Sequence, residues 1–301
     1  MSQSIQPKIS GLDLLLIFAV TLIWGSSYPV MKFAVTNYPA GIFRAFTFFV
    51  GAACVGLYAK ARGDTLFIPL NERRIILNLS FVNMALWHVG IIYGIRLLNS
   101  GRAAIMGYTM PVWALLTTVV IYKAPLRAKA LLGVVCSLTA TVILGHDEFT
   151  NFAGHPLGVA LTVGAAFFWG LGTTLLKHSK LSISSIALTF WMLSFGFVFF
   201  LFVGIVFERD AWRWPDALEW LAIAHSGGLS FGVGYVAWFL VARKLTPVTS
   251  GLSVTLVPIL GLLGGAIFLG EQIAYTDILA LILILIAMVL VLAPNRQEEN
   301  N

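Results

Sequence analysis

Three ionisable side chains lie within or at the margins of long apolar stretches: Lys32, Arg44 and His88. Such groups cost about 2.5–3.5 kcal/mol at the centre of a membrane, so each is a candidate for function. His88 lies midway along its stretch and is predicted to contact a solute or titrate; the alternative is a neutral histidine bonded to a neighbouring helix. Lys32 and Arg44 lie near the ends of theirs, where long side chains are expected to reach the interface. Recognition of a carboxylate is their alternative role.

Aromatic rings are the second group of residues with usable chemistry. Trp24 and Tyr28 share a helical face because they are four residues apart, and Tyr235 and Trp238 lie on another face. Such rings more often pack or mark the membrane interface, but lining a cavity they would stack on aromatic solutes and attract cations. The predicted cavity residues are Trp24, Tyr28, Asn83, Trp87, His88, Trp169, Tyr235 and Trp238.

No pattern typical of an enzyme accompanies these residues. The sequence has no His-Glu-x-x-His, no Gly-x-Ser-x-Gly, no paired intramembrane aspartates and no Cys/His cluster. Cys54 and Cys136 each lie within an apolar stretch and are expected to pack rather than to form a disulfide. We therefore expect no metal and no cofactor, and an integral-membrane enzyme is the weaker alternative. A scaffold or receptor is also weaker, since a receptor usually has more chain outside its helices.

The elements that must position these residues are transmembrane helices. Of the 301 residues, 59% are hydrophobic and 11% are charged, against about 25% charged in a soluble domain. Ten apolar segments have about the length that spans a bilayer as a helix. They are Leu12–Ala34, Ala40–Ala59, Ile75–Leu98, Ala103–Tyr122, Ala128–Gly145, Pro156–Leu176, Ser184–Phe207, Leu218–Ala242, Thr249–Gly270 and Tyr275–Ala293. The predicted fold class is all-α integral membrane, in a lipid bilayer and without a nucleic-acid partner.

The basic residues indicate the orientation. With a cytoplasmic N-terminus, thirteen Lys and Arg residues fall on the cytoplasmic side: Lys8, Lys60, Arg62, Arg73, Arg74, Lys123, Arg127, Lys129, Lys177, Lys180, Arg243, Lys244 and Arg296. The other side has four: Arg96, Arg102, Arg209 and Arg213. This asymmetry predicts that both termini are cytoplasmic.

The two halves of the chain repeat one another. Trp24, Gly25 and Lys32 recur 145 positions later as Trp169, Gly170 and Lys177. Arg96, Leu98, Pro111, Leu115 and Leu116 recur 147 positions later as Arg243, Leu245, Pro258, Leu262 and Leu263. We expect a first five-helix repeat at 1–146 and a second at 147–301. Five is odd, so the second repeat enters the membrane inverted, as in many carriers. The matched Pro111 and Pro258 are predicted hinges.

These features together resemble the drug/metabolite transporter superfamily, in its EamA-type ten-helix branch, and most of all the bacterial aromatic amino acid exporters. The residues that carry the resemblance are Trp-Gly early in the first helix of each half, a proline in each fourth helix, and Leu269-Gly270-Glu271. The resemblance implies a central cavity with the fifth and tenth helices outside it. It also implies a bacterial inner-membrane location. One departure is Lys123-Ala124 at the position matching Gly270-Glu271, which favours a structural capping role for Glu271.

The expected function is export of amino acids, aromatic and other neutral ones, by alternating access. No aspartate or glutamate lies near the centre of a segment, which favours facilitated uniport over proton coupling. Nucleosides, purines or cationic drugs are alternative cargoes, with proton coupling an alternative mode. A nucleotide-sugar carrier would need more basic residues in its cavity. We expect a monomer.

Overall fold

The computed structural model describes residues 10–150, 154–242 and 254–292, and no strand occurs among them. Eight helices in these ranges are long and apolar enough to cross a membrane. They are α1 (Gly11–Asn37), α2 (Ala40–Arg62), α3 with η1 and α4 (Arg73–Leu97), α5 with α6 (Ser100–Tyr122), α7 (Ala128–Thr150), α8 (Pro156–His178), α9 (Ser185–Phe207) and α14 (Tyr275–Leu292). The remaining elements are η2 (Arg209–Ala211), α10 (Ala217–Ile223), η3 (Ala224–Gly234), α11 (Tyr235–Ala242) and α13 (Val257–Leu269).

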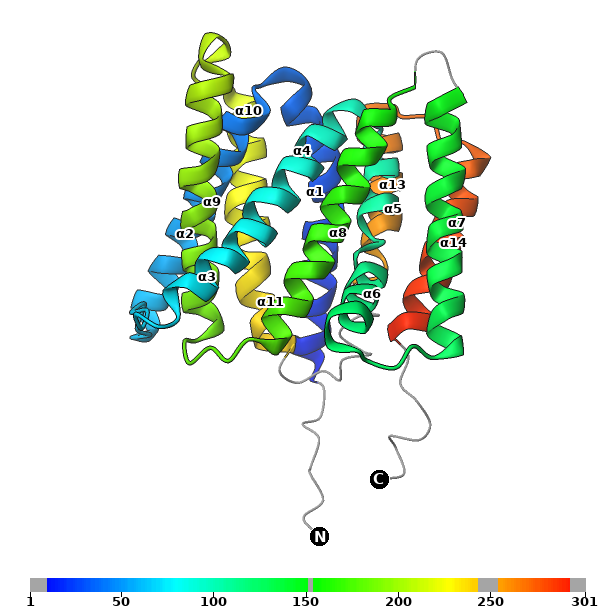
Figure 1. Cartoon of the computed structure of the whole chain (residues 1–301). Coiled ribbons are helices and arrows are strands. Elements are labelled where there is room, and N and C mark those ends of the chain that lie inside the picture. The colour runs from blue at the N-terminus through cyan, green and yellow to red at the C-terminus, as the bar shows by residue number, and fades with distance from the viewer. Residues whose placement is uncertain (1–9, 151–153, 243–253, 293–301) are drawn as a thin grey trace.

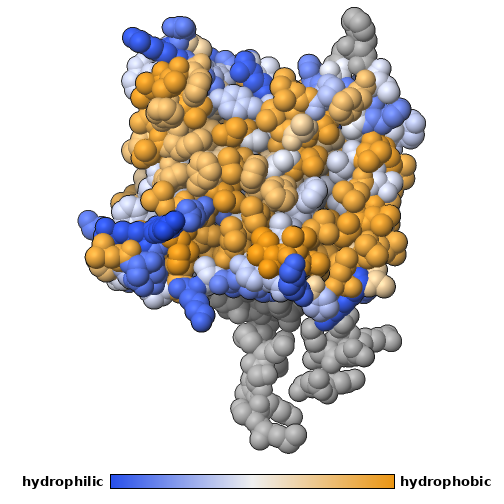
Figure 2. Space-filling view, in the orientation of Figure 1, coloured by the Kyte–Doolittle hydropathy of each residue, from blue (hydrophilic) through white to orange (hydrophobic). Residues whose placement is uncertain are grey.

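The helices run between two faces of the molecule (Figure 1). We call the face where α1 begins and α14 ends the terminal face, and the other the opposite face. Figure 2 shows a broad apolar surface between these faces with hydrophilic residues gathered toward both edges. A surface of this kind suits a bilayer, where lipid chains cover the apolar belt and water the edges.

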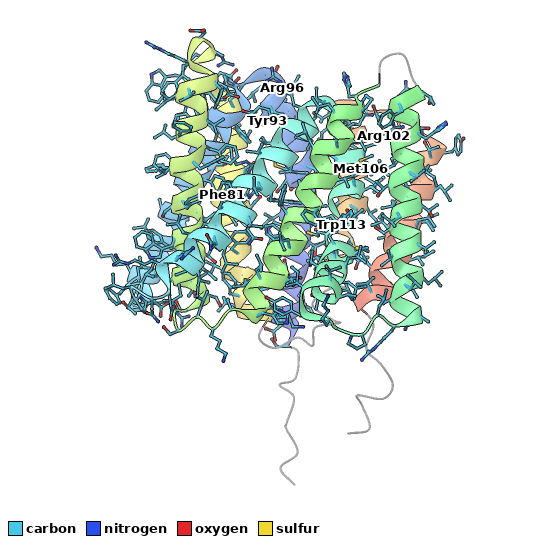
Figure 3. All side chains as sticks on the ribbon, in the orientation of Figure 1. Phe81, Tyr93, Arg96, Arg102, Met106 and Trp113 are labelled. Atoms are coloured by element: carbon cyan, nitrogen blue, oxygen red, sulfur yellow. The ribbon has the colours of Figure 1, made fainter. Side chains whose placement is uncertain are left out.

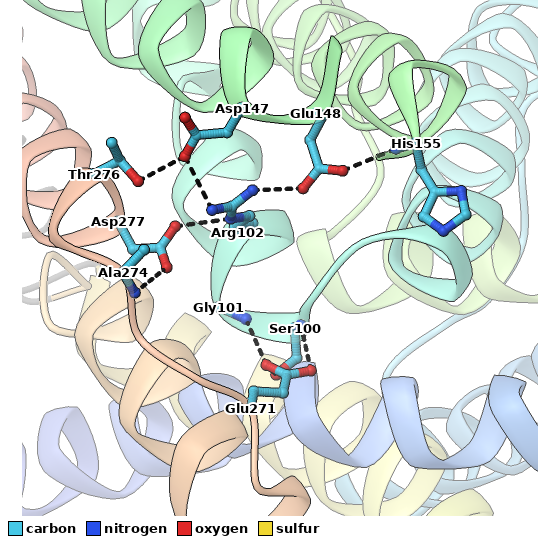
Figure 4. Close-up of polar contacts among 10 residues, drawn as sticks. All are labelled: Ser100, Gly101, Arg102, Asp147, Glu148, His155, Glu271, Ala274, Thr276 and Asp277. Atoms are coloured by element: carbon cyan, nitrogen blue, oxygen red, sulfur yellow. Dashed lines mark hydrogen bonds and ion pairs between the residues drawn. The ribbon is translucent and has the colours of Figure 1, made fainter. Parts of the chain in front are cut away.

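Most predicted segment limits agree with the helices, and α7 shows the largest difference. Its predicted end was Gly145, but the helix continues to Thr150. The added turn places Asp147 and Glu148 against Arg102, whose guanidinium also contacts Asp277 (Figure 4). The charged turn could not be recognised as helix by its hydropathy. In the segment predicted as Thr249–Gly270, residues 249–253 lie outside the described ranges, as do Arg243 and Leu245 of the repeat.

The helices α7 and α14 pack together at one edge of the bundle (Figure 1). A methyl group on Gly133 would lie 2.9 Å from a Val291 side-chain carbon, so the two backbones approach closely. Both helices expose apolar side chains on their outer faces, among them Leu132, Val142 and Ile282. These outer faces suit contact with lipid.

The prolines predicted as hinges lie where helices begin. α5 ends at Gly107, and after a turn at Tyr108–Thr109 the helix α6 starts at Met110 with Pro111 in its first turn. α13 starts at Val257 with Pro258 in the same position. A proline in the first turn lacks an N–H that the helix does not need, so neither Pro111 nor Pro258 removes a helical hydrogen bond. Both instead mark a helix start within the bundle.

The glycines of the two Trp-Gly pairs lie against the helices that begin at these prolines. A methyl group on Gly25 would clash with Leu260 of α13, and one on Gly170 would lie 2.6 Å from the backbone nitrogen of Ala114 in α6. The side-chain Cβ of Trp113 would be 2.7 Å away. Leu260 and Trp113 each stand two positions after a proline, so both repeated motifs make the same contact, each with the other half of the chain.

Two stretches of π-helix were not predicted: η1 (Phe81–Leu86) and η3 (Ala224–Gly234). A π-turn holds more residues than an α-turn, so side chains that follow it rotate relative to those that precede it. Its hydrogen-bond ring is also wider, and such turns are frequent at functional sites. Both stretches occur at matching places in the two halves and, as shown below, η3 borders the cavity.

Two carboxylates cap helix starts at the opposite face. Glu208 accepts hydrogen bonds from the backbone N–H groups of Gly41 (2.9 Å) and Ile42 (3.1 Å) and from the Tyr93 hydroxyl (2.9 Å). Glu271 accepts from the backbone N–H and the hydroxyl of Ser100, both at 2.8 Å (Figure 4). The capping role predicted for Glu271 is confirmed by these contacts. Tyr93 and Arg102 lie toward this face in Figure 3, whereas Trp113 lies nearer the terminal face.

Candidate functional site

A cavity of about 520 Å³ lies among helices from both halves of the chain. Its wall includes Trp24 of α1, Trp87 of α4, Trp169 of α8 and Trp238 of α11. Leu292, at the terminal-face end of α14, also lines it, so the cavity extends toward the terminal face. Among the described residues, the lining does not include the capped first turns of α2 and α5, which lie at the opposite face.

The structure brings most of the predicted residues to this cavity. Those that line it are Trp24, Tyr28, Arg44, Trp87, His88, Pro111, Trp169, Tyr235 and Trp238. Asn83, Lys32 and Pro258 do not line it. The repeat explains part of the convergence, because the paired tryptophans Trp24 and Trp169 approach the cavity from opposite halves.

Asn83 lies in η1 and faces the helix α8 instead of the cavity. Its amide donates to the Leu79 carbonyl oxygen at 3.1 Å, and a methyl group on Gly172 would clash with it. Asn83 precedes Trp87 by four residues. That spacing defines a shared face in an α-helix, but the intervening π-turn rotates the two side chains apart.

Lys32 and Pro258 are also held away from the cavity. The Lys32 ammonium donates to the backbone oxygen of Arg96 at 3.0 Å, toward the opposite face. This agrees with the interfacial role expected for it. Pro258 is buried near the start of α13, where its neighbour Val257 reaches the cavity instead.

The aromatic rings form two groups within the cavity wall. The ring centroids of Trp87 and Trp169 are 5.1 Å apart, and those of Trp24 and Trp238 are 5.6 Å apart. Tyr235 extends the second group, with its ring 6.1 Å from Trp24. Rings at these distances attract one another and present faces on which a flat solute could stack.

Arg44 does not reach the interface as we had expected from its place in the sequence. Its side chain is 1% exposed and lines the cavity. The guanidinium carbon lies 5.5 Å from the Phe231 ring centroid and 5.9 Å from that of Phe48, and Nη2 lies 2.9 Å from the Met31 sulfur. A residue's distance from a segment end does not reveal whether the side chain points along the helix or into the bundle.

His88 lies beside this cation in the cavity wall. Its ring is 4% exposed and packs edge-on against Phe48, with the centroids 4.8 Å apart. Neither ring nitrogen has a hydrogen-bond partner, so the alternative of a histidine bonded to a neighbouring helix does not describe it. A buried polar group without a partner costs free energy, and in a cavity a bound solute can supply the missing partner.

Serine hydroxyls are a further feature of the cavity wall, and the sequence analysis did not predict them. Ser27 and Ser230 hydrogen-bond to each other at 2.7 Å, and the Trp24 indole donates to the backbone oxygen of Ser230 at 3.3 Å. The hydroxyl of Ser226, also in the wall, is buried and has no partner. Ser27 and Ser230 directly precede Tyr28 and Phe231 in the sequence, but serine is too common in transmembrane helices for this position to be distinctive.

The charge of the cavity wall is positive. Arg44 is the charged residue among the described residues that line it, and none of these is an aspartate or glutamate. Nor do the described ranges contain a group of three or more His, Cys, Asp or Glu residues that could hold a metal ion. The arrangement is suited to binding a solute with an anionic group and an apolar or aromatic body.

Comparison with known proteins gives a consistent result. Residues 12–145 and 156–293 each match the EamA-like transporter family. The chain is 28% identical to the uncharacterized transporter YoaV of Bacillus subtilis (strain 168), over 89% of this chain and 92% of YoaV. It is 24% identical to the uncharacterized inner membrane transporter YedA of Escherichia coli (strain K12), over 91% and 89% of the two chains. One solved crystal structure, at 18% identity, covers 96% of this chain and 99% of its own with a TM-score of 0.66, which indicates the same fold.

Proposed function

Because the chain belongs to the EamA-like transporter family, we propose that it exports neutral amino acids, aromatic ones included, from the cytoplasm. The observation that carries this proposal is the buried Arg44 guanidinium, which lies among aromatic rings in the cavity without a carboxylate partner in its wall. A substrate carboxylate would supply the missing charge, and the tryptophan faces would hold an apolar or aromatic side chain. A cationic drug would meet an uncompensated positive charge in the same place.

We further propose ten membrane crossings in two inverted repeats, residues 1–146 and 147–301. The matched contacts of Gly25 with α13 and of Gly170 with α6 support this arrangement, because each repeat supplies the same contact to the other. The count of basic residues favours a cytoplasmic terminal face. The name of YedA supports an inner-membrane location. We propose that the carrier works as a monomer.

The proposed mechanism is alternating access. The cavity extends toward the terminal face while Glu208 and Glu271 cap helix starts at the opposite face, so this arrangement would load a solute from the cytoplasm. The helix starts at Pro111 and Pro258 are the proposed hinges between this state and one open to the other side. Pro111→Ala or Pro258→Ala is expected to slow transport several-fold; unchanged rates in both would remove the hinge role.

We propose facilitated uniport because the described cavity wall offers no carboxylate to carry a proton. The main experiment is counterflow of radiolabelled phenylalanine into proteoliposomes preloaded with unlabelled phenylalanine, without an ion gradient. Arg44→Gln is expected to lower the initial rate at least about tenfold, since a hydrogen bond to a charged group contributes about 1.5–3 kcal/mol. Trp169→Ala is expected to lower it by about two- to tenfold, since an aromatic contact contributes about 0.5–1.5 kcal/mol. Lys32→Gln is the matched control, because it removes a positive charge that lies outside the cavity.

Two outcomes would contradict this proposal. If adenosine is transported and neither phenylalanine, threonine nor any other amino acid is, the substrates are nucleosides and not amino acids. Accumulation of phenylalanine against its gradient when only a pH gradient is imposed would exclude uniport and indicate proton coupling.

A further inference from the structure

The polar groups in the cavity wall complement one end of an amino acid and not the other. An amino acid presents a carboxylate and an ammonium group, which differ in charge and in hydrogen bonding. For the carboxylate the wall offers Arg44, whose Nε has no partner, and His88, whose two ring nitrogens have none. Ser226 adds a third buried side chain with an unpartnered polar atom. All three are more than nine-tenths buried, so bulk water does not satisfy them.

The helix starts reinforce this positive character. Met110 and Pro111 at the start of α6 line the cavity, as does Val257 at the start of α13. The amino-terminal end of a helix carries a partial positive charge, and each of these helices is 13 residues long. Helices that begin inside a membrane bundle commonly direct that end at an anionic substrate group.

For an ammonium group the described part of the wall offers hydroxyl acceptors but no carboxylate. None of the described lining residues is acidic, so no ion pair can form with the ammonium. The hydroxyls of Ser27 and Ser230 are engaged with each other at 2.7 Å. The faces of Trp24 and Trp238 can attract a cation, but such contacts contribute less than an ion pair with hydrogen bonds. The ammonium group is thus tolerated in this cavity and not specifically bound.

We propose that the cavity recognises the carboxylate alone, so that the protein also carries monocarboxylates that have an aromatic or branched apolar tail and no amino group. This inference rests on the proposed function, since it assigns the substrate class of the same cavity. A volume of about 520 Å³ lies in the range of about 300–1,000 Å³ typical of small-molecule sites and is ample for a phenyl ring with a short acid chain. The simplest member of the class for testing is 3-phenylpropionate, which is phenylalanine without its amino group.

The test uses the purified full chain in proteoliposomes and three compounds that share the phenyl tail. Phenylalanine has both charged groups, 3-phenylpropionate lacks the ammonium, and phenylalaninamide lacks the carboxylate. In competition with radiolabelled phenylalanine, we expect 3-phenylpropionate to inhibit within about threefold of unlabelled phenylalanine. Phenylalaninamide is expected to be at least about tenfold weaker, because its neutral amide cannot form an ion pair with Arg44.

A second measurement separates transport from leakage of the protonated acid through lipid. On a solid-supported membrane, carrier-mediated movement of the 3-phenylpropionate anion produces a transient current, whereas the neutral acid and zwitterionic phenylalanine produce none. Arg44→Gln is expected to abolish the current, and Lys32→Gln to retain it. Should Arg44→Gln fail to fold, the comparison of the three compounds on the unaltered protein still decides the question.

The outcomes distinguish this inference from the proposed function. If phenylalanine is transported while 3-phenylpropionate neither competes nor gives a current, the inference is wrong and amino acid export stands. If 3-phenylpropionate gives a current and no amino acid moves, the proposed function is wrong and carboxylate recognition stands. Equal inhibition by phenylalaninamide and 3-phenylpropionate would overturn the inference, because binding would then be independent of the carboxylate.

Discussion

Gly170→Ala tests a close approach between the backbones of the two halves of the chain. An added methyl group would lie 2.6 Å from the Ala114 backbone nitrogen, 2.7 Å from the Trp113 Cβ and 2.8 Å from the Trp113 carbonyl carbon. These atoms belong to α6 and cannot move without the helix, so we take the upper end of the usual overpacking cost, about 3 kcal/mol. Replacing glycine by alanine within a helix returns about 1 kcal/mol, which leaves a net loss of about 2 kcal/mol.

Gly164 provides the matched control on the same helix. A methyl group there would meet nothing within 4 Å, so Gly164→Ala is expected to be neutral or to gain up to about 1 kcal/mol. The two variants should therefore differ by about 2–3 kcal/mol. The assay is the unfolding temperature of the purified protein in detergent, where each kcal/mol corresponds to about 2–4 °C. Equal unfolding temperatures for Gly164→Ala and Gly170→Ala would refute the close contact of α8 with α6.

Three further predictions concern the ends of helices. Glu271→Ala removes the cap from the two Ser100 donors and should lower the free energy of unfolding by about 1–2 kcal/mol, measured by the same thermal assay. Lys123 has a left-handed backbone with φ 55°, so Lys123→Gly should raise stability by about 1 kcal/mol; a loss would show that the lysine side chain contributes more than the strain. A hydrogen bond from the Ser182 hydroxyl lowers the pKa of the Glu72 carboxyl below its usual value of 4.5. The ionised carboxylate therefore stabilises the fold at pH values above 4.5, and this contribution is lost as the pH falls through the lowered pKa. The unfolding temperature should thus fall more steeply on acidification in the unaltered protein than in Glu72→Gln, and parallel curves would exclude this role.

The transmembrane helices could be predicted from the sequence because a bilayer requires long runs of apolar side chains, and hydropathy detects such runs. Errors appeared where charged residues continue a helix, as at Asp147 and Glu148 of α7, which Arg102 neutralises from a distant part of the chain. A second difference arose at Pro111, where composition suggested one long segment and the structure has a helix end, a turn and a new helix start. Neither feature has a local signal in hydropathy.

The candidate site was predictable to the extent that the repeat and the helical period determine it. Trp24 and Trp169 were found because duplication places them at matching positions, and both line the cavity. Asn83 was misplaced because a π-turn interrupts the period on which its assignment depended. Arg44 was expected at the interface because the sequence gives its depth along the helix but not the direction in which it points. The serines of η3 carried no signal above the background of small residues in membrane helices.

The tryptophans of the cavity wall give the protein a built-in optical reporter. Four of its nine tryptophans, Trp24, Trp87, Trp169 and Trp238, line the cavity and lie in two pairs with centroids 5.1 Å and 5.6 Å apart. A ring that stacks between them changes the surroundings of nearly half of the indole groups at once. Intrinsic emission can therefore follow occupancy of the cavity in the unlabelled protein, and an anionic quencher such as iodide, drawn to Arg44, should reach these indoles more readily than a cationic one such as caesium.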